Sequence, residues 1–132
     1  MKKLISLVFG LTLATGFSLA YGANLPVEGS WGTTFSQNGF DFDMTMKLEN
    51  QQMTTTNRCT FQGNTAIVSV TVPAAYDGST ITTQANAEQN VSQNGVNCNV
   101  SVRPDRMNYV VSGSSLTLSH DGSPEQITLI RR

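Results

Sequence analysis

The sequence has few of the residues on which catalysis, metal binding and nucleic-acid binding usually depend. Only 13% of its 132 residues are charged, its formal net charge is -1, and His120 is its only histidine. Without an excess of basic residues, binding to nucleic-acid phosphates or to anionic lipid is disfavoured. The sequence also has no CxxC or HxxxH spacing and no GxGxxG loop before a helix. We therefore expect no metal site, no cofactor and no nucleic-acid partner.

Candidate catalytic groups are equally scarce. His120 is followed by Asp121 and Gly122, a pair typical of turns, and it has no obvious nucleophile partner. Asp41 and Asp43 alternate along one segment, where two carboxylates side by side would suit a cation, but a solvated strand face is the simpler interpretation. We predict that the protein is not an enzyme.

Long hydrophobic runs are also missing, with one exception near the start. Residues 4–17 are mostly apolar, follow Met-Lys-Lys and precede Ser18-Leu19-Ala20, which is the pattern of a secretory signal. The run is shorter than the roughly 20 residues of a membrane-spanning helix. No cysteine follows it directly, so a lipoprotein anchor is not expected. We predict a periplasmic or secreted protein with no membrane span, and its predicted organisation is a signal peptide at 1–20 (cleavage as late as 23), an N-terminal arm at 21–29 and one domain at 30–132.

Two cysteines, Cys59 and Cys98, remain in a chain that the signal would send to an oxidising compartment. Pairing is the expected outcome there, and both residues fall on apolar faces of alternating segments. A disulfide closing this loop would stabilise the domain by roughly 3 to 4 kcal/mol in the chain-entropy model.

Alternation of apolar and polar residues is the dominant pattern after residue 29. Residues 40–49 alternate without an error, from Phe40 to Glu49, and 96–103 do the same around Cys98. Such alternation predicts half-buried strands, and no segment has the 3.6-residue period of a helix. The predicted strands are 30–36, 40–49, 53–62, 65–72, 79–88, 96–103, 106–112, 115–119 and 125–131.

Turn signals separate these strands at short intervals. The tetrapeptide Ser-Gln-Asn-Gly occurs at 36–39 and again at 92–95, and Asn-Gly is the strongest signal for a tight hairpin. Short links between successive strands favour an up-and-down arrangement, in which closure of the sheet removes exposed edges. We predict an all-β fold, a small antiparallel up-and-down barrel of eight to nine strands.

The two ends of this predicted barrel resemble the lipocalin and calycin superfamily. Gly29-Ser30-Trp31 is similar to the Gly-x-Trp signature at the start of that family's first strand, and Arg131 stands in the last strand as the family's arginine does. The resemblance, which also extends to small secreted bacterial calycin-like proteins, implies that Arg131 packs over the Trp31 indole. Gly29, Trp31 and Arg131 would then close one end of the barrel.

The residues predicted to face inward are unequal in size. Large side chains are frequent on most strands, whereas 79–88 places Ile81, Thr83, Ala85 and Ala87 inward. A barrel of about eight strands is either filled by its side chains or holds one small ligand. The uncharged segment 89–95 would form a loop at the rim of such an opening. The predicted ligand-binding residues are Met44, Met46, Phe61 and Tyr109.

Three functions are consistent with these features. The first is non-catalytic binding of a small apolar ligand by a monomeric barrel, with methionine walls that adapt to the guest. The second is inhibition of a secreted protease or other hydrolase through the N-terminal arm or the hairpin loops. The third is a structural or interaction module of the cell envelope with a filled core.

Overall fold

The structure is a computed structural model that describes residues 25–132, and all regular elements in this part of the chain are strands. The prediction of an all-β fold is confirmed. The strands are β1 (Gly29–Gln37), β2 (Phe40–Glu49), β3 (Gln52–Phe61), β4 (Asn64–Tyr76), β5 (Thr80–Thr83), β6 (Ala87–Gln93), β7 (Val96–Val102), β8 (Asp105–Ser112), β9 (Ser115–Ser119) and β10 (Gln126–Arg131).

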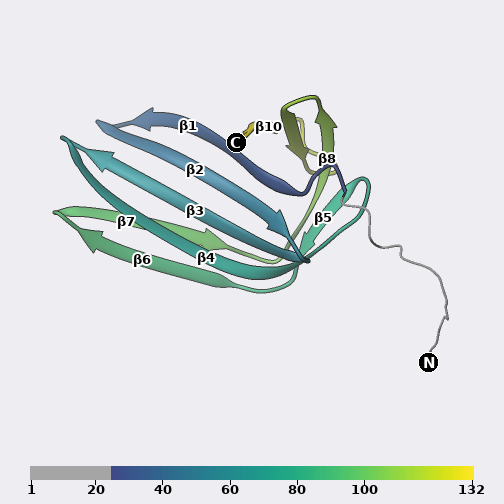
Figure 1. Cartoon of the computed structure of the whole chain (residues 1–132), viewed down its shortest axis with the longest axis horizontal. Helices are drawn as coiled ribbons and strands as arrows, with labels where there is room; N and C mark the ends of the chain where they lie inside the picture. The colour runs from purple at the N-terminus through teal and green to yellow at the C-terminus, as the bar shows by residue number, and fades with distance from the viewer. Residues whose placement is uncertain (1–24) are drawn as a thin grey trace.

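Eight of these strands close into an antiparallel barrel in the order β1-β10-β9-β8-β5-β4-β3-β2. The predicted barrel is therefore confirmed. Neighbouring strands in the ring are successive in the sequence, except where β5 is followed by β8 and where β10 closes on β1. Strands β6 and β7 pair only with each other, so the expectation that successive strands all enter the ring is wrong for this hairpin. In Figure 1 the long strands β1 to β4 form one curved sheet, with the β6–β7 hairpin beside β4.

The predicted strand 79–88 is wrong in its extent. The chain leaves the ladder at Gln84–Asn86, between the four-residue β5 and the separate strand β6. Residues 89–95, predicted to be a rim loop, instead form most of β6 and its turn to β7. The segments before and after the break pair with different strands. β5 pairs with β8, whereas β6 pairs with β7, so 89–95 are held in a hairpin and not in a loop.

Strand β4 is longer than the predicted 65–72 and passes through Pro73 to Tyr76. Proline is tolerated there because β4 is near the end of its pairing with β3, where Pro73 faces Gln52 in the register.

The two Ser-Gln-Asn-Gly segments form the predicted tight turns. Asn38 and Gly39 have φ values of 55° and 84°, and Asn94 and Gly95 have 52° and 77°. Positive φ at both central residues matches the twist of the flanking strands in a two-residue hairpin. These turns set the registers of β1 with β2 and of β6 with β7.

The inward faces of the strands build two cores. The main core lies inside the barrel, where Trp31, Leu48, Ile81 and Leu116 have no exposed surface. The hairpin core lies between β3, β4 and the β6–β7 hairpin, and its buried members are Cys59, Ala66, Val68, Val96, Cys98 and Val100.

A disulfide joins Cys59 on β3 to Cys98 on β7, with the two Cα atoms 5.7 Å apart. The predicted pairing is confirmed. Because β7 is outside the ring, the bond connects the hairpin covalently to the barrel sheet. Disulfides of this kind are typical of proteins outside reducing compartments.

One end of the barrel is closed by the two ends of the described chain. The guanidinium of Arg131 lies 3.9 Å from the Trp31 ring centroid, and it donates to the carbonyl oxygens of Pro26 and Glu28. The Trp31 indole N–H donates to the Val27 carbonyl at 2.8 Å, so the packing of arginine on tryptophan expected from the resemblance is present. Gly29 has a φ of 117°, and a Cβ there would lie 2.8 Å from Arg131 Nη1.

The segment before β1 is packed at this closed end. Val27 has no exposed surface, and Glu28 N–H donates to the Leu25 carbonyl in a tight turn. Residues 25–28 of the predicted arm therefore belong to the barrel. The predicted signal peptide and residues 21–24 lie outside the described residues.

No helix long and apolar enough to cross a membrane is present between residues 25 and 132.

Candidate ligand-binding site

The end of the barrel opposite Trp31 is open, because β1 and β10 separate there. The two strands pair only at Trp31 with Arg131 and at Gly32 with Ile130, although both continue in that direction. Phe35 on β1 and Ile127 on β10 are on the same faces as Trp31 and Leu129, yet 45% and 51% of their surfaces are exposed. We call this region the open end.

A cavity of about 140 Å³ lies at the open end. Its wall is almost entirely apolar, and it includes Met44 and Met46 of β2, Leu118 of β9 and Leu129 of β10. None of the residues around it carries a charge. The complete set is Thr33, Met44, Thr45, Met46, Thr55, Leu118, Ile127 and Leu129. This arrangement suits a small uncharged guest.

The structure brings together two of the four predicted ligand-binding residues. Met44 and Met46 both line the cavity, with Met46 buried and Met44 half-buried. Phe61 lies at the far end of β3, where its ring stacks on Phe40 with centroids 4.5 Å apart. Tyr109 is buried in the main core, and its hydroxyl donates to the Asp77 carbonyl. The alternation pattern predicted the inward direction of these side chains but not their positions along the barrel axis.

Four phenylalanine rings extend the apolar surface beyond the cavity. Phe35 stacks on Phe42 at 4.9 Å, Phe42 on Phe40 at 5.9 Å and Phe40 on Phe61 at 4.5 Å. We call these residues the aromatic row. The row results from the β1–β2 and β2–β3 registers, which place Phe35 opposite Phe42 and Phe40 opposite Phe61. The Asn38-Gly39 turn, which fixes the β1–β2 register, was the sequence signal from which the Phe35–Phe42 part of this row could have been found.

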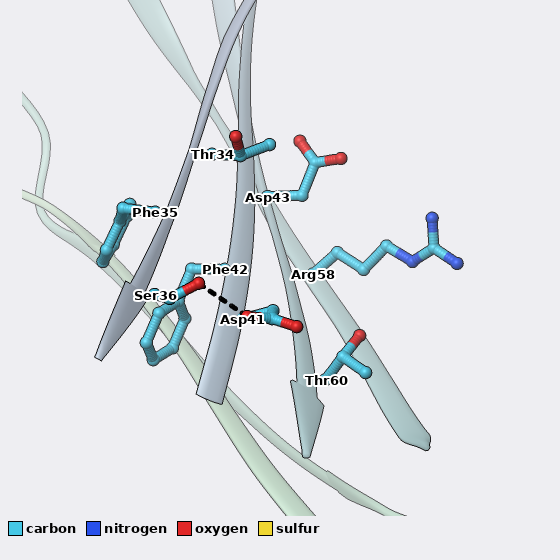
Figure 2. Close-up of a pocket in the computed structure, with 8 residues that line it drawn as sticks. All are labelled: Thr34, Phe35, Ser36, Asp41, Phe42, Asp43, Arg58 and Thr60. Carbon is cyan, nitrogen blue, oxygen red and sulfur yellow. Dashed lines mark hydrogen bonds between the residues drawn. The ribbon is translucent and has the colours of Figure 1, made fainter. Parts of the chain in front are cut away.

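The outer face of the same strands is a shallow polar groove (Figure 2). Its side chains include Thr34, Ser36, Asp41, Arg58 and Thr60, while Figure 2 shows Phe35 and Phe42 on the opposite side of the sheet. Ser36 donates to Asp41 at 2.6 Å.

The neighbouring carboxylate of Asp43 forms an ion pair with Arg132. Asp41 and Asp43 thus point outward, as predicted, but each already has a protein partner. Among residues 25–132 no group of three or more histidine, cysteine, aspartate or glutamate side chains is arranged for a metal ion.

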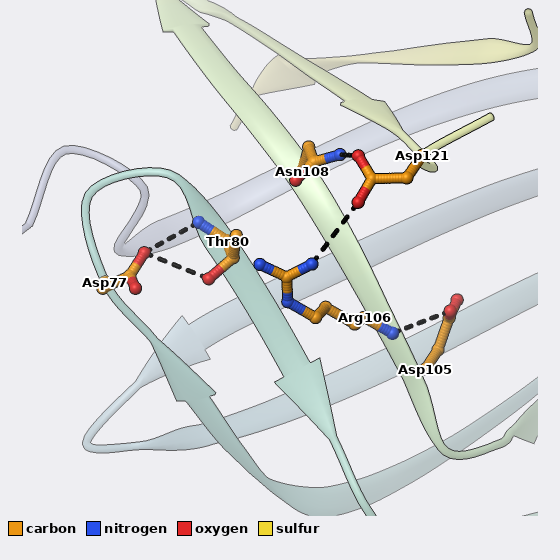
Figure 3. Close-up of polar contacts among 6 residues, drawn as sticks. All are labelled: Asp77, Thr80, Asp105, Arg106, Asn108 and Asp121. Atoms are coloured by element: carbon orange, nitrogen blue, oxygen red, sulfur yellow. Dashed lines mark hydrogen bonds and ion pairs between the residues drawn. The ribbon is translucent and has the colours of Figure 1, made fainter. Parts of the chain in front are cut away.

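A second polar cluster lies on β8 and the turn after β9 (Figure 3). Asp121 accepts from Asn108 at 2.7 Å and pairs with Arg106 at 3.5 Å. His120 Nε2 lies 2.8 Å from an oxygen of Asp105, and both side chains are about half exposed. This cluster holds the turn to the barrel wall, and solvent screens its Arg106–Asp121 ion pair.

Aspartate also fixes the β4–β5 turn. Asp77 accepts hydrogen bonds from the backbone N–H groups of Ser79 and Thr80, each at 2.8 Å. These bonds lower the pKa of the Asp77 carboxyl below its usual value. Burial raises the pKa of Tyr109, whose hydroxyl packs against this turn, and the Asp77 charge raises it further.

At the closed end, Tyr76 connects β4 to the segment before β1. Its hydroxyl donates to Glu28 Oε2 at 2.6 Å and accepts from the Gln51 backbone N–H at 3.2 Å. Burial, followed by the hydrogen bond to Glu28, raises the pKa of Tyr76 to about 12. Tyr76 and Glu28 are therefore used in closing this end, and the apolar cavity beside Met44 and Met46 lies at the other end.

The described structure defines a small, closed, eight-stranded antiparallel barrel with one capped end and one open apolar end. Comparison of the chain with protein-family models, with curated proteins and with solved structures found no match.

Proposed function

We propose that this chain is a non-catalytic, lipocalin-like binding protein of the periplasm or extracellular space that holds one small apolar molecule at its open end. The observation that carries the proposal is the cavity of about 140 Å³ behind Met44 and Met46. A closed barrel provides a rigid wall, so little ordering is required when a guest binds. The methionine side chains let that wall adapt to shape.

The size of the cavity limits the ligand. An apolar cavity of about 150 Å³ in another protein stays dry and accepts benzene, so a guest the size of one aromatic ring fits here. A longer molecule would insert only one end and lay the rest against the aromatic row, where Phe35 is 45% exposed. The disulfide between Cys59 and Cys98 and the predicted secretory signal support an oxidising compartment. The Trp31–Arg131 packing supports the lipocalin-like assignment.

Toluene binding to the oxidised protein, followed by NMR of the methionine methyl groups, tests this proposal. We expect saturable shifts at Met44 and Met46 with a dissociation constant on the order of 1 mM or below. Met44→Trp should fill the cavity and abolish the shifts at Met46. The matched control is Ile67→Trp on the outer face of β4, where 52% of the side chain is exposed, and it should bind as the wild type does. Shifts that never saturate, or that survive in Met44→Trp, would refute the proposal.

A further inference from the structure

We propose that Asn57 selects ligands that carry a neutral hydrogen-bond donor, such as a phenol or an alcohol. This inference rests on the proposed function and assigns a polar determinant to the open end. Asn57 lies on β3 and is 9% exposed. Apart from the buried aromatic residues, only Asn57 and Thr83 among the buried residues of the described chain have a polar side chain.

The two ends of the Asn57 carboxamide differ in their partners. Nδ2 donates to the Asn99 carbonyl of β7 at 2.9 Å, which holds the hairpin to the sheet. Oδ1 is buried and has no hydrogen-bond partner among the described residues. The amide cannot simply be turned over, because Oδ1 would then face the Asn99 carbonyl and two acceptors would meet.

Asn57 also lies next to the cavity. In the β2–β3 register it is the direct partner of Met44, and it is two residues from Thr55 on the same face of β3. Met44 and Thr55 both line the cavity. The Cβ atoms of directly opposed residues on one face of a sheet lie about 5 Å apart. The Met44 side chain is therefore the group that stands between the Asn57 carboxamide and a guest in the cavity. Met44 is half-buried and flexible, and a change of its rotamer would join the two spaces.

A buried carbonyl oxygen without a partner is rare in folded proteins and costs stability. The bond to Asn99 accounts for the amide nitrogen but not for the oxygen. A ligand with an apolar body and an O–H or N–H group would satisfy the oxygen when it binds. The same oxygen, in a site whose wall has no charge, disfavours carboxylates and other anions.

Paired ligands and variants test this assignment. Phenol and toluene have nearly the same shape, and only phenol donates a hydrogen bond. We expect Asn57→Leu to weaken phenol binding relative to toluene binding by about tenfold compared with the wild type, the value of one buried hydrogen bond. Because the phenol-to-toluene affinity ratio of the variant is compared with that of the wild type, the difference in hydration between the two free ligands cancels. Thr56→Val, which removes a hydroxyl from the outer face of the same strand and from a residue that does not line the cavity, should leave the ratio unchanged.

A second measurement on the wild type avoids any effect of Asn57→Leu on folding. The NMR signal of the Asn57 side-chain carbonyl carbon should move when phenol binds and stay in place when toluene binds. If both ligands bind but the ratio is the same in Asn57→Leu and the carbonyl signal does not respond, the inference is refuted and the proposed function stands; a resident water on Oδ1 would give this result. If neither ligand binds the wild type, the proposed function itself is refuted.

Discussion

The main core and the hairpin core share strands β3 and β4 but are stabilised in different ways. The main core contains Trp31, Leu48, Ile81 and Leu116, all without exposed surface, and no covalent cross-link. The hairpin core is built chiefly from valine, alanine and cysteine, and its hairpin has no ladder partner in the barrel. Small side chains in a two-layer contact bury less apolar area, so they stabilise less. The disulfide is located in the core whose buried side chains are the smaller ones.

The open end lies between these two cores. There β1 has lost its pairing with β10, and the hairpin on β3 and β4 does not cover the aromatic row completely, since Phe35 remains 45% exposed. The space for a ligand thus lies beside the main core, where β1 and β10 have separated. Each region can be weakened separately, and the responses should differ in size.

Trp31→Ala should have the largest effect. The indole is completely buried, packs against Arg131 and donates to the Val27 carbonyl. We expect a loss of about 3 to 5 kcal/mol in the free energy of unfolding, measured by denaturant titration. Phe35→Ala is the matched control, because it removes an aromatic ring from the same face of the same strand at the open end. It should cost less than half as much, and equal losses would contradict the distinction between a closed and an open end.

Removal of the disulfide should have the next largest effect and should act on the hairpin first. Cys59→Ala with Cys98→Ala opens a loop with a sequence separation of 39 residues, and we expect a loss of about 2 to 4 kcal/mol. Amide hydrogen exchange should accelerate in β6 and β7 while β1, β2 and β10 stay protected. The double variant is compared with the oxidised wild type at the same pH. Uniform acceleration through all strands would mean that the two cores unfold together.

Tyr76 should produce the smallest effect and a distinct dependence on pH. Its pKa in the folded state, about 12, is above the ordinary value of 10.0. The contribution of its protonated hydroxyl is therefore complete below pH 10 and is lost as the pH rises toward 12. Tyr76→Phe should lower the free energy of unfolding by about 1 to 2 kcal/mol at pH 8, since the bond to Glu28 is lost. The difference between the two proteins should shrink from pH 10 to pH 12, and a constant difference would contradict the raised pKa.

The sequence carried most of the local structure. Alternation located β2 and β7 almost to the residue, and Asn38-Gly39 and Asn94-Gly95 predicted two hairpins correctly. These features depend on neighbouring residues only. The break at Gln84–Asn86 was missed because alternation continues across it, although the chain there changes from the barrel ladder to the hairpin.

Two of the four predicted ligand-binding residues lie together in the cavity, and the other two do not. Met44 and Met46 are on one strand, so their proximity follows from spacing alone. Phe61 and Tyr109 are on other strands. Their positions along the barrel axis depend on strand registers that the sequence does not show. Asn57 was not singled out at all, because a polar residue in a threonine-rich strand has no distinguishing pattern until its burial is known.

The sequence by itself determined most of the strands, the two tight turns and the inward direction of both cysteines, and its resemblance to the calycins implied which residues meet at the closed end. Only the tertiary structure decided that β5 pairs with β8, that the β6–β7 hairpin stays outside the ring, and that β1 and β10 separate after Gly32. The physical reason is range. Alternation of apolar and polar residues and the choice of turn residues depend on neighbours in the chain. Closure of the ring and the cavity beside Met44 depend instead on how side chains that are distant in sequence, such as Trp31, pack inside the barrel.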